Sequence, residues 1–158
     1  MEKIRVCFVC LGNICRSPTA EAVFLDLIEK EGLSDRFVVD SAGTGSWHVG
    51  ERAHRDTRAE AKRRGIEVKS IARQFIGEDF ARFDYVLAMD RSNHANLLRI
   101  APEDQENKLH LFRTFDPDSE VGAEVPDPYY EGGFPKVYDI CEAAARGFLN
   151  HVKSAHGF

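Results

Sequence analysis

The stretch that decides the fold is Ile4-Arg5-Val6-Cys7-Phe8-Val9-Cys10-Leu11-Gly12-Asn13-Ile14-Cys15-Arg16-Ser17-Pro18. Its first half, Ile4–Cys10, is apolar on both faces apart from Arg5, which predicts a strand buried between two layers of helices. From about Ser17 the apolar residues recur at helical spacing, and Gly32 ends this pattern, whose members are Ala20, Val23, Phe24, Leu27 and Ile28. A buried strand, a short loop and a helix therefore open the chain.

The rest of the chain repeats this alternation. We expect strands at 37–41, 85–89 and 108–112, helices at 57–64, between 90 and 101 and from about Pro135, and loops at 43–50 and 113–133. The last helix carries a buried stripe, namely Val137, Tyr138, Cys141, Ala144, Ala145, Phe148, Leu149 and Val152. Such alternation predicts an α/β fold, with a parallel sheet between helices and a ligand site at the carboxyl ends of the strands.

Composition narrows the class of protein. The 158 residues fit one domain, residues 1–158, and 43% hydrophobic residues are enough for a core. A net charge of −5, with charges of both signs interspersed, argues against nucleic acid as a partner. The apolar run at 6–11 is too short for a signal peptide or a membrane span, so we expect a soluble cytoplasmic protein with no membrane partner.

Four cysteines, Cys7, Cys10, Cys15 and Cys141, are compatible with two disulfides, but a chain of this length folds without them. We therefore expect reduced thiols. Cys7 lies mid-strand and Cys141 lies on the apolar stripe of the last helix, so both are assigned to the core. A metal site from Cys7 and Cys10 is excluded, because positions three apart on a strand face opposite sides.

The loop after the first strand carries the chemistry. Cys10 and Arg16 are separated by five residues at a helix N-terminus, where unpaired N–H groups favour an anion. Gly12 and Asn13 tolerate positive φ and let the loop curl around that anion, and the Arg16 guanidinium grips two of its oxygens. The positive surroundings favour the thiolate of Cys10, and the Ser17 hydroxyl is placed to donate to its sulfur.

Alone, a cysteine five residues before an arginine is a weak motif, and the alternative is a core cysteine beside a surface arginine. Its position between a buried strand and a helix that starts with Ser17-Pro18 makes it specific. A nucleotide-binding P-loop is excluded, because the chain has no Gly-Lys-Ser/Thr.

Four segments together resemble the low-molecular-weight protein tyrosine phosphatase family over essentially the whole chain: VCLGNICRSPTAE at 9–21, DSAGT at 40–44, FDYVLAMD at 83–90 and PDPYY at 126–130. The resemblance implies a flavodoxin-like three-layer sandwich of the phosphotyrosine phosphatase I type, with a four-stranded parallel sheet flanked by helices. It also implies hydrolysis of phosphotyrosine in a protein substrate, without a cofactor or metal and with inorganic phosphate as the product.

Residue roles follow from the same resemblance. It makes Cys10 the nucleophile, Arg16 the phosphate clamp and Asp127 the general acid. It assigns the phosphate-binding loop to Leu11, Gly12, Asn13, Ile14, Cys15 and Ser17, and loop support to Ser41. Because Asp127 must carry a proton to protonate the leaving group, we expect activity to peak on the acidic side of neutral. The alternative for Asp127 is a solvated turn aspartate before a proline.

The cleft for a flat ring is assigned to three aromatic residues. Tyr129 and Tyr130 supply one wall and Trp47 another, since exposed aromatic rings offer stacking area. The two tyrosines also resemble a pair that kinases modify in relatives.

Three features stay open from the residues alone. Cys15 either packs the loop or acts as a resolving thiol that captures oxidised Cys10 in a disulfide, and the family favours the second role. Ser70 stands where relatives often carry a histidine that holds the loop, which predicts altered loop rigidity. Arg73-Gln74 matches a family segment without a physical explanation, and the six histidines show no pairing with a nucleophile.

Two other functions compete. Arsenate reduction uses a similar anion loop in related proteins, but it needs accessible thiols in relay, and only Cys15 lies near Cys10. A non-catalytic phosphate-binding module would usually lack Cys10, Arg16 or Asp127, and all three are present.

Overall fold

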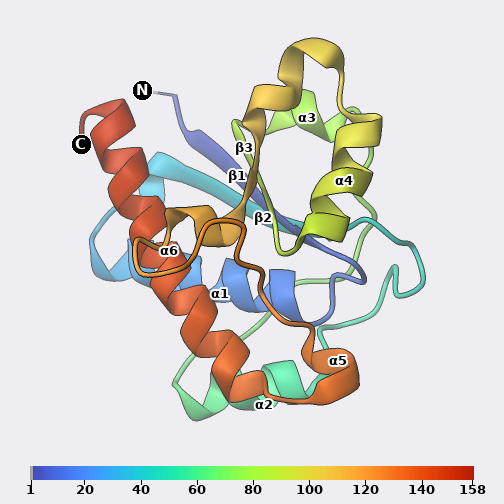
Figure 1. The fold of residues 1–158 in the computed structure, drawn as a ribbon. Helices are drawn as coiled ribbons and strands as arrows, with labels where there is room; N and C mark the ends of the chain where they lie inside the picture. The colour runs from blue at the N-terminus through green and yellow to red at the C-terminus, as the bar shows by residue number, and fades with distance from the viewer. Residues whose placement is uncertain (1) are drawn as a thin grey trace.

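A central parallel sheet organises the molecule. The computed structural model describes residues 2–158, except for the side chain of Glu131. Four strands pair in the order β2-β1-β3-β4, and every pairing is parallel (Figure 1). Their bounds are β1 (Ile4–Cys10), β2 (Phe37–Gly43), β3 (Tyr85–Ala88) and β4 (Leu109–Leu111). The predicted four-stranded α/β fold is confirmed.

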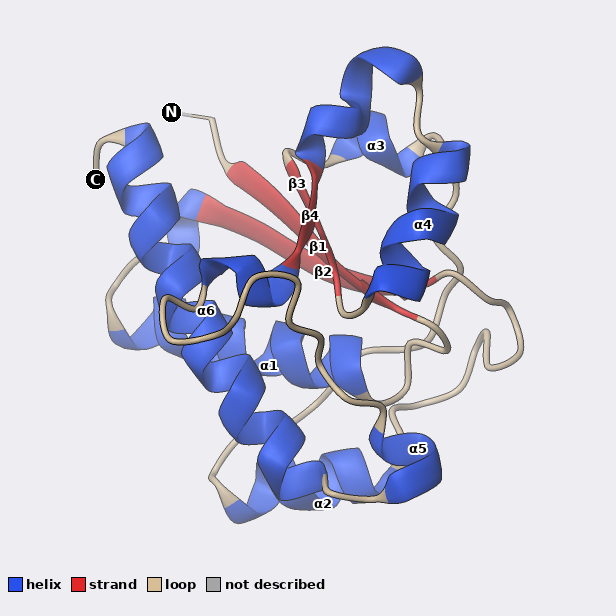
Figure 2. Cartoon of the chain, viewed as in Figure 1, coloured by secondary structure: helices blue, strands red, loops and turns tan. Residues whose placement is uncertain are grey.

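Helices cover both faces of this sheet (Figure 2). The longer ones are α1 (Arg16–Lys30), α2 (Arg55–Arg63), α4 (Arg91–Ile100) and α6 (Phe134–His156), and the single-turn helices are α3 (Asp79–Arg82) and α5 (Pro128–Glu131). Figure 1 shows α1, α2 and α6 on one side of the sheet and α3 and α4 on the other. Three 3₁₀ segments complete the fold, at Ser34–Arg36, Glu103–Lys108 and Phe112–Phe115.

β1 divides the core in two. Val6, Phe8 and Cys10 belong to the cluster that packs with α1 and α6, whereas Cys7 and Val9 belong to the cluster with α4. This alternation follows from the two-residue repeat of a strand. It confirms that Cys7 and Cys10 face opposite sides of the sheet.

The predicted stripe of α6 is confirmed at every position, since all eight residues are buried. The short elements were not predicted. α5 lies in the predicted loop 113–133, α3 and the segment Ser34–Arg36 lie where no element was assigned, and the other two 3₁₀ segments overlap the ends of the predicted strand 108–112. A single turn offers too few residues for a helical period to emerge. Across residues 2–158, no helix combines the length and hydropathy that a bilayer span requires.

Candidate active site

The loop between β1 and α1 lies where the strand order reverses. β1 lies between β2 and β3. Residues 11–15 leave the carboxyl end of β1, and the connections on the two sides of this strand run in opposite directions. Ligands bind at such a point in open α/β sheets. The loop is fastened to the end of β2: the Thr44 N–H donates to the Cys10 carbonyl at 2.8 Å, and the Gly45 N–H donates to the Leu11 carbonyl at 2.9 Å. Gly43 permits this approach, because a Cβ there would meet the Leu11 carbonyl oxygen at 2.7 Å.

A cavity of about 360 Å³ opens over this loop. Three segments far apart in sequence form its wall: the loop itself, the 43–50 loop and the 127–130 segment. The lining residues are Cys10, Leu11, Gly12, Ile14, Cys15, Arg16, Trp47, His48, Asp127, Tyr129 and Tyr130. All of them except His48 were assigned to the site from sequence.

A buried chain of hydrogen bonds supports the loop. The Cys10 Sγ lies 3.0 Å from the Ser17 Oγ. The Asn13 Nδ2 donates to the Ser17 Oγ at 2.8 Å and to the Ser41 Oγ at 3.0 Å. Because the Ser17 hydroxyl accepts from Asn13, its own proton is directed either to the Cys10 sulfur or to the Ala42 carbonyl oxygen at 3.3 Å. Ser17 and Ser41 therefore lie where loop support was predicted.

Asn13 shapes the loop through its backbone. Its φ of 57° makes it the one non-glycine residue in the left-handed region among residues 2–158, a conformation that asparagine tolerates. The Asn13 Oδ1 accepts from the Arg73 N–H at 3.0 Å, which fixes the side chain. Gly12, expected to share this conformation, has no positive φ. It is instead needed for close packing, because a Cβ there would lie 3.0 Å from the His48 Cδ2.

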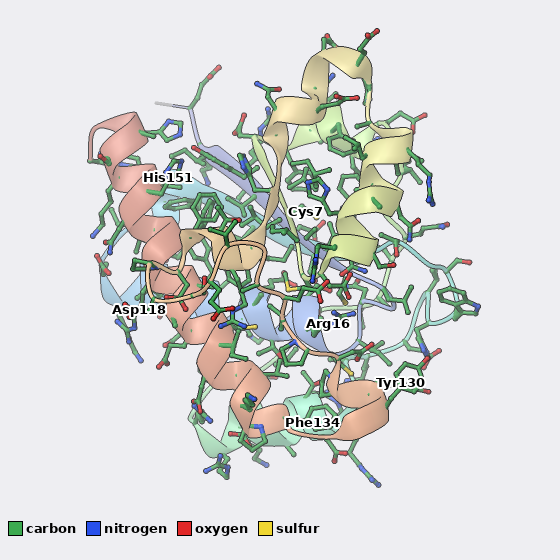
Figure 3. All side chains as sticks on the ribbon, viewed as in Figure 1. Cys7, Arg16, Asp118, Tyr130, Phe134 and His151 are labelled. Carbon is green, nitrogen blue, oxygen red and sulfur yellow. The ribbon has the colours of Figure 1, made fainter. Side chains whose placement is uncertain are left out.

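Arg16 is the first residue of α1 and only 3% exposed. Its Nη1 donates to the Asp90 Oδ2 at 2.7 Å and to the Val125 carbonyl at 3.0 Å, and its Nη2 lies 3.5 Å from the Asp127 Oδ2. Burial opposes the charge, yet Cys10 and the two carboxylates outweigh burial and raise the pKa of Arg16 above its ordinary value. Figure 3 shows Arg16 in the interior of the molecule.

Asp127 reaches the cavity from the far end of the chain. It is the N-cap of α5, since its Oδ1 accepts from the Tyr129 N–H at 3.0 Å. Its Oδ2 faces Arg16, and its side chain is 28% exposed. The two adjacent prolines restrict the backbone around this position. Asp127 is therefore held at the cavity rather than lying in a solvated turn.

Aromatic rings form the rim of the cavity. Trp47 is 71% exposed and Tyr130 is 77% exposed, and Figure 3 shows Tyr130 on α5. Tyr129 meets Tyr130 edge-on, with their ring centroids 5.0 Å apart, and lies 6.1 Å from the ring of His48. The three aromatic residues assigned to the cleft therefore all line the cavity.

Comparison with known proteins decides the family. A family model described as low molecular weight phosphotyrosine protein phosphatase matches residues 5–156. The chain belongs to this family. A Schizosaccharomyces pombe protein described as a low molecular weight phosphotyrosine protein phosphatase is 45% identical over 154 residues, with 96% of this chain and 98% of that protein covered. Low-molecular-weight phosphatases are hydrolases, and this chain is an enzyme of that class.

Solved structures agree with this assignment. The crystal structure of YfkJ from Bacillus subtilis superimposes with a TM-score of 0.93 at 38% identity and covers 98% of both chains. A structure described as DARP, Drosophila arginine phosphatase, superimposes with a TM-score of 0.88 at 35% identity, covering 95% of this chain and 98% of that one. The fold of a low-molecular-weight phosphatase is therefore shown over nearly the whole chain.

Two residues that contact the candidate site were missed from sequence. Asp90 follows the end of β3 and holds Arg16, and its position at the carboxyl end of a parallel strand was the available signal. His48 packs against Gly12, and its Nδ1 lies 3.1 Å from the Glu51 Oε2. No sequence pattern connects His48 to the loop, because only the folded chain brings residues 12 and 48 together.

Arg73 now has a physical explanation. Its backbone N–H supports Asn13, while its guanidinium bridges Asp40 at 3.0 Å and Asp79 at 3.0 Å. Ser70 lies nearby on the wall of a separate cavity that also includes Glu21. Among the hydrogen bonds of residues 2–158, none joins Ser70 to the loop, so Arg73 and Ser41 hold Asn13 here.

Glu21 ends the supporting chain. The Ser41 hydroxyl donates to the Glu21 Oε1 at 2.6 Å. Burial raises the pKa of the Glu21 carboxyl to about 7, and Asp40 adds to this rise, whereas the Ser41 hydrogen bond and Arg73 oppose it. The folded protein therefore retains a proton on Glu21 at pH values where the unfolded chain, with an ordinary pKa of 4.5, has lost it.

Replacing Glu21 with glutamine should change how stability depends on pH. The raised pKa of Glu21 contributes to the stability of the wild-type protein. This contribution is fully present below pH 4.5 and is lost as pH rises through about 7. The glutamine side chain retains an oxygen acceptor for Ser41 but cannot ionise. The difference in unfolding free energy, Glu21→Gln minus wild type, should therefore rise by about 2 kcal/mol from pH 5 to pH 8. Urea unfolding at both pH values measures this gain.

The control for that experiment is Glu29→Gln, an exposed position on the same helix. This variant should follow the wild-type pH dependence. Parallel pH dependence of Glu21→Gln and wild type would show that the carboxyl of Glu21 does not retain its proton in the folded protein.

The other thiols are buried and reduced, as predicted. Burial raises the pKa of Cys141 to about 12 and that of Cys7 well above its ordinary value. Cys15 lines the cavity with Cys10, and burial likewise raises its pKa to about 12. At neutral pH these three side chains are therefore neutral thiols.

Proposed function

We propose that this phosphatase hydrolyses phosphotyrosine in proteins, and small aryl phosphates, through a phosphocysteine intermediate. One observation carries the proposal: Cys10, Arg16 and Asp127 line a single cavity with aromatic walls. In this proposal Cys10 is the nucleophile, Arg16 the phosphate clamp and Asp127 the general acid and base. Their convergence disfavours a non-catalytic phosphate-binding module, for which the carboxylate would have no use.

In the first step, the Cys10 thiolate attacks phosphorus in line with the phenolic oxygen. The S–P bond forms as the P–O bond breaks, and Asp127 transfers its proton to the departing oxygen. Negative charge on the equatorial oxygens is stabilised by Arg16 and by amide groups of the 11–15 loop and the first turn of α1. Asp90 keeps the guanidinium oriented, which reduces the reorganisation needed during the reaction.

In the second step, water attacks the phosphocysteine. Asp127, now ionised, accepts a proton from that water, the S–P bond breaks, and inorganic phosphate leaves with Cys10 restored as thiolate. The position of Asp127 beside both Arg16 and the open side of the cavity supports this double use.

Aromatic walls favour an aryl substrate over a phosphoguanidine. Trp47 and Tyr130 are exposed at the cavity opening, where they offer stacking surface to a phenyl ring. Arginine phosphatase activity, named for one solved neighbour, is the second candidate. A phosphotyrosine peptide should be hydrolysed with a kcat/KM at least about tenfold above that of its phosphoarginine counterpart, and the reverse order would favour the second candidate.

Arsenate reduction has weaker support. The thiols that line the cavity, within the described part of the chain, are Cys10 and Cys15. Cys7 lies in the core cluster on the other side of the sheet, and Cys141 is fully buried on α6. Neither offers an accessible third thiol for a relay.

Asp127→Asn should lower kcat for p-nitrophenyl phosphate about 10²- to 10³-fold, because the variant has no proton to donate. The loss should be larger for a phenyl leaving group than for a p-nitrophenyl leaving group, which needs less protonation. Wild-type kcat/KM should be highest on the acidic side of neutral, because the reaction needs a proton on residue 127, and the variant should lack this preference. Steady-state rates from pH 4.5 to 9 measure both effects.

The control is Asp118→Asn in the same long loop, which does not line the cavity, and it should retain the wild-type profile. A wild-type rate that rises steadily above pH 8, or an equal loss for both leaving groups, would exclude Asp127 as the general acid.

We also propose that Cys15 protects Cys10 during oxidation. Peroxide converts Cys10 to a sulfenic acid, and the Cys15 thiol then displaces water to form a Cys10–Cys15 disulfide. After brief peroxide treatment, Cys15→Ser should accumulate about tenfold more sulfinic and sulfonic acid at Cys10 than wild type. The disulfide should form faster as pH rises, because the Cys15 pKa of about 12 limits its thiolate. Peptide mass spectrometry measures the disulfide and the over-oxidised forms of Cys10. Over-oxidised Cys10 without any Cys10–Cys15 disulfide in wild type would refute the protective role.

A further inference from the structure

A second, shallower cavity of about 580 Å³ adjoins the one over Cys10. The two share part of their walls, because Ile14, His48 and Tyr129 line both. The second cavity extends from this shared wall over residues 51–55 and the first turn of α2. None of its other residues has a place in the hydrolytic mechanism.

Arginine side chains dominate the charge of this second cavity. Arg52, Arg55 and Arg58 line it, whereas the chain as a whole has a net charge of −5. Arg55 lies 3.7 Å from a carboxylate oxygen of Asp56. Arg52 and Arg58 make no ion pair with any carboxylate that the structure describes, so two guanidinium groups remain for an external anion.

The histidines and the acidic residue of this wall are already engaged. The Glu51 carboxylate pairs with the His48 ring. The His54 Nδ1 accepts from the Asp56 N–H, and its ring stacks on Phe134 at 5.2 Å. They therefore leave Arg52 and Arg58 as the unpaired charges among the described residues that line the cavity.

Backbone hydrogen bonds fix residues 51–55 relative to the loop over Cys10. The His54 N–H donates to the Ile14 carbonyl at 2.8 Å, and the Ala72 N–H donates to the Glu51 carbonyl at 2.8 Å. The Arg58 Nε donates to the Ala53 carbonyl at 2.9 Å, so its two terminal amino groups remain available. Because the backbone is fixed at these points, an anion bound here would stand at a constant distance from the phosphate site.

We propose that this arginine cavity is a specificity subsite that binds an acidic side chain close to the phosphotyrosine of the protein substrate. The proposal rests on the function proposed above. A residue of extended chain spans about 3.5 Å, so side chains one to three residues from the phosphotyrosine reach an adjoining cavity. Guanidinium groups bind carboxylates through paired N–H donors, which suits aspartate and glutamate.

The test compares phosphotyrosine peptides that differ only at flanking positions. One set carries glutamate at the three positions before or the three positions after the phosphotyrosine, and the reference carries glutamine. In wild type, kcat/KM for glutamate on one side should exceed the reference about five- to tenfold, and the ratio should fall towards one in about 0.5 M NaCl. Within each variant the peptide ratio cancels any change in the catalytic step.

Arg52→Gln/Arg58→Gln should reduce this ratio to about one, and Arg52→Glu should shift the preference towards lysine-flanked peptides. Arg99→Gln, on α4 across the sheet, is the matched control and should retain the wild-type ratio. A wild-type ratio of one on both sides, or a ratio that persists in the double variant, would overturn the subsite. Wild-type hydrolysis of p-nitrophenyl phosphate tests the proposed phosphatase function independently of the subsite, because that substrate has no flanking residues.

Discussion

Cys10→Ser should abolish turnover of p-nitrophenyl phosphate, with kcat lowered on the order of 10⁴-fold or more. A serine hydroxyl is hardly ionised at neutral pH, and the side-chain hydrogen-bond neighbour of position 10 among the described residues is the Ser17 hydroxyl, which is too weak a base to activate it. Binding of inorganic phosphate should persist, because Arg16 and the loop amides are unchanged. Stopped-flow rates and phosphate titration measure the two effects independently.

Cys7→Ala is the matched control for that variant. Cys7 lies on the same strand, three residues earlier, with its side chain in the opposite core cluster. It should retain kcat within about twofold while losing about 1 kcal/mol of stability from the lost packing. Acid-quenched wild-type reactions should contain a phosphorylated peptide with Cys10, and a label on any other residue would contradict the phosphocysteine step.

Arg16→Lys should lower kcat on the order of 10³-fold, although the positive charge is kept. Lysine cannot offer two parallel N–H groups to the equatorial oxygens, and it cannot reproduce the bonds from Nη1 to Asp90 and Val125. Asp90, which is partly buried, would also lose the short hydrogen bond that it accepts from the guanidinium. Vanadate, which imitates the five-coordinate transition state, should lose more affinity than phosphate does.

Arg113→Lys is the control for Arg16→Lys. The Arg113 guanidinium donates to the Glu124 carbonyl at 2.9 Å but does not line the cavity over Cys10. It should keep kcat near the wild-type value. Equal losses of phosphate and vanadate affinity in Arg16→Lys would show that Arg16 binds the ground state and has no special role in the transition state.

Long and strongly patterned elements could be predicted from sequence. The buried strand Ile4–Cys10 and the stripe of α6 each have enough residues for their periodicity to stand out. Element ends were less accurate: α2 begins at Arg55 rather than residue 57, because His54 caps it with a ring nitrogen, which is an unusual acceptor at that position. The single-turn helices α3 and α5 had no pattern to reveal them.

The supporting residues of the site show the same division. One contiguous motif contains Cys10, Arg16 and Ser17, so the sequence alone indicates that these residues act together. Asp90 and Glu21 were present in matched segments, yet their bonds to Arg16 and Ser41 depend on how β3 and α1 pack against β1. The arginine cavity beside the site was invisible for the same reason, since exposed arginines on a helix usually indicate only a solvated face.

The sequence by itself determined the anion loop of this protein, because a buried strand, a turn-forming Asn13 and a helix start are local preferences of the chain. Only the tertiary structure decided what surrounds that loop. Asp127 reaches Arg16 across 111 residues. The arginines of 52–58 share a cavity with Ile14, and the His54 N–H donates to the Ile14 carbonyl. Contacts of that kind depend on the packing of the whole sheet, whose geometry no single stretch of residues contains.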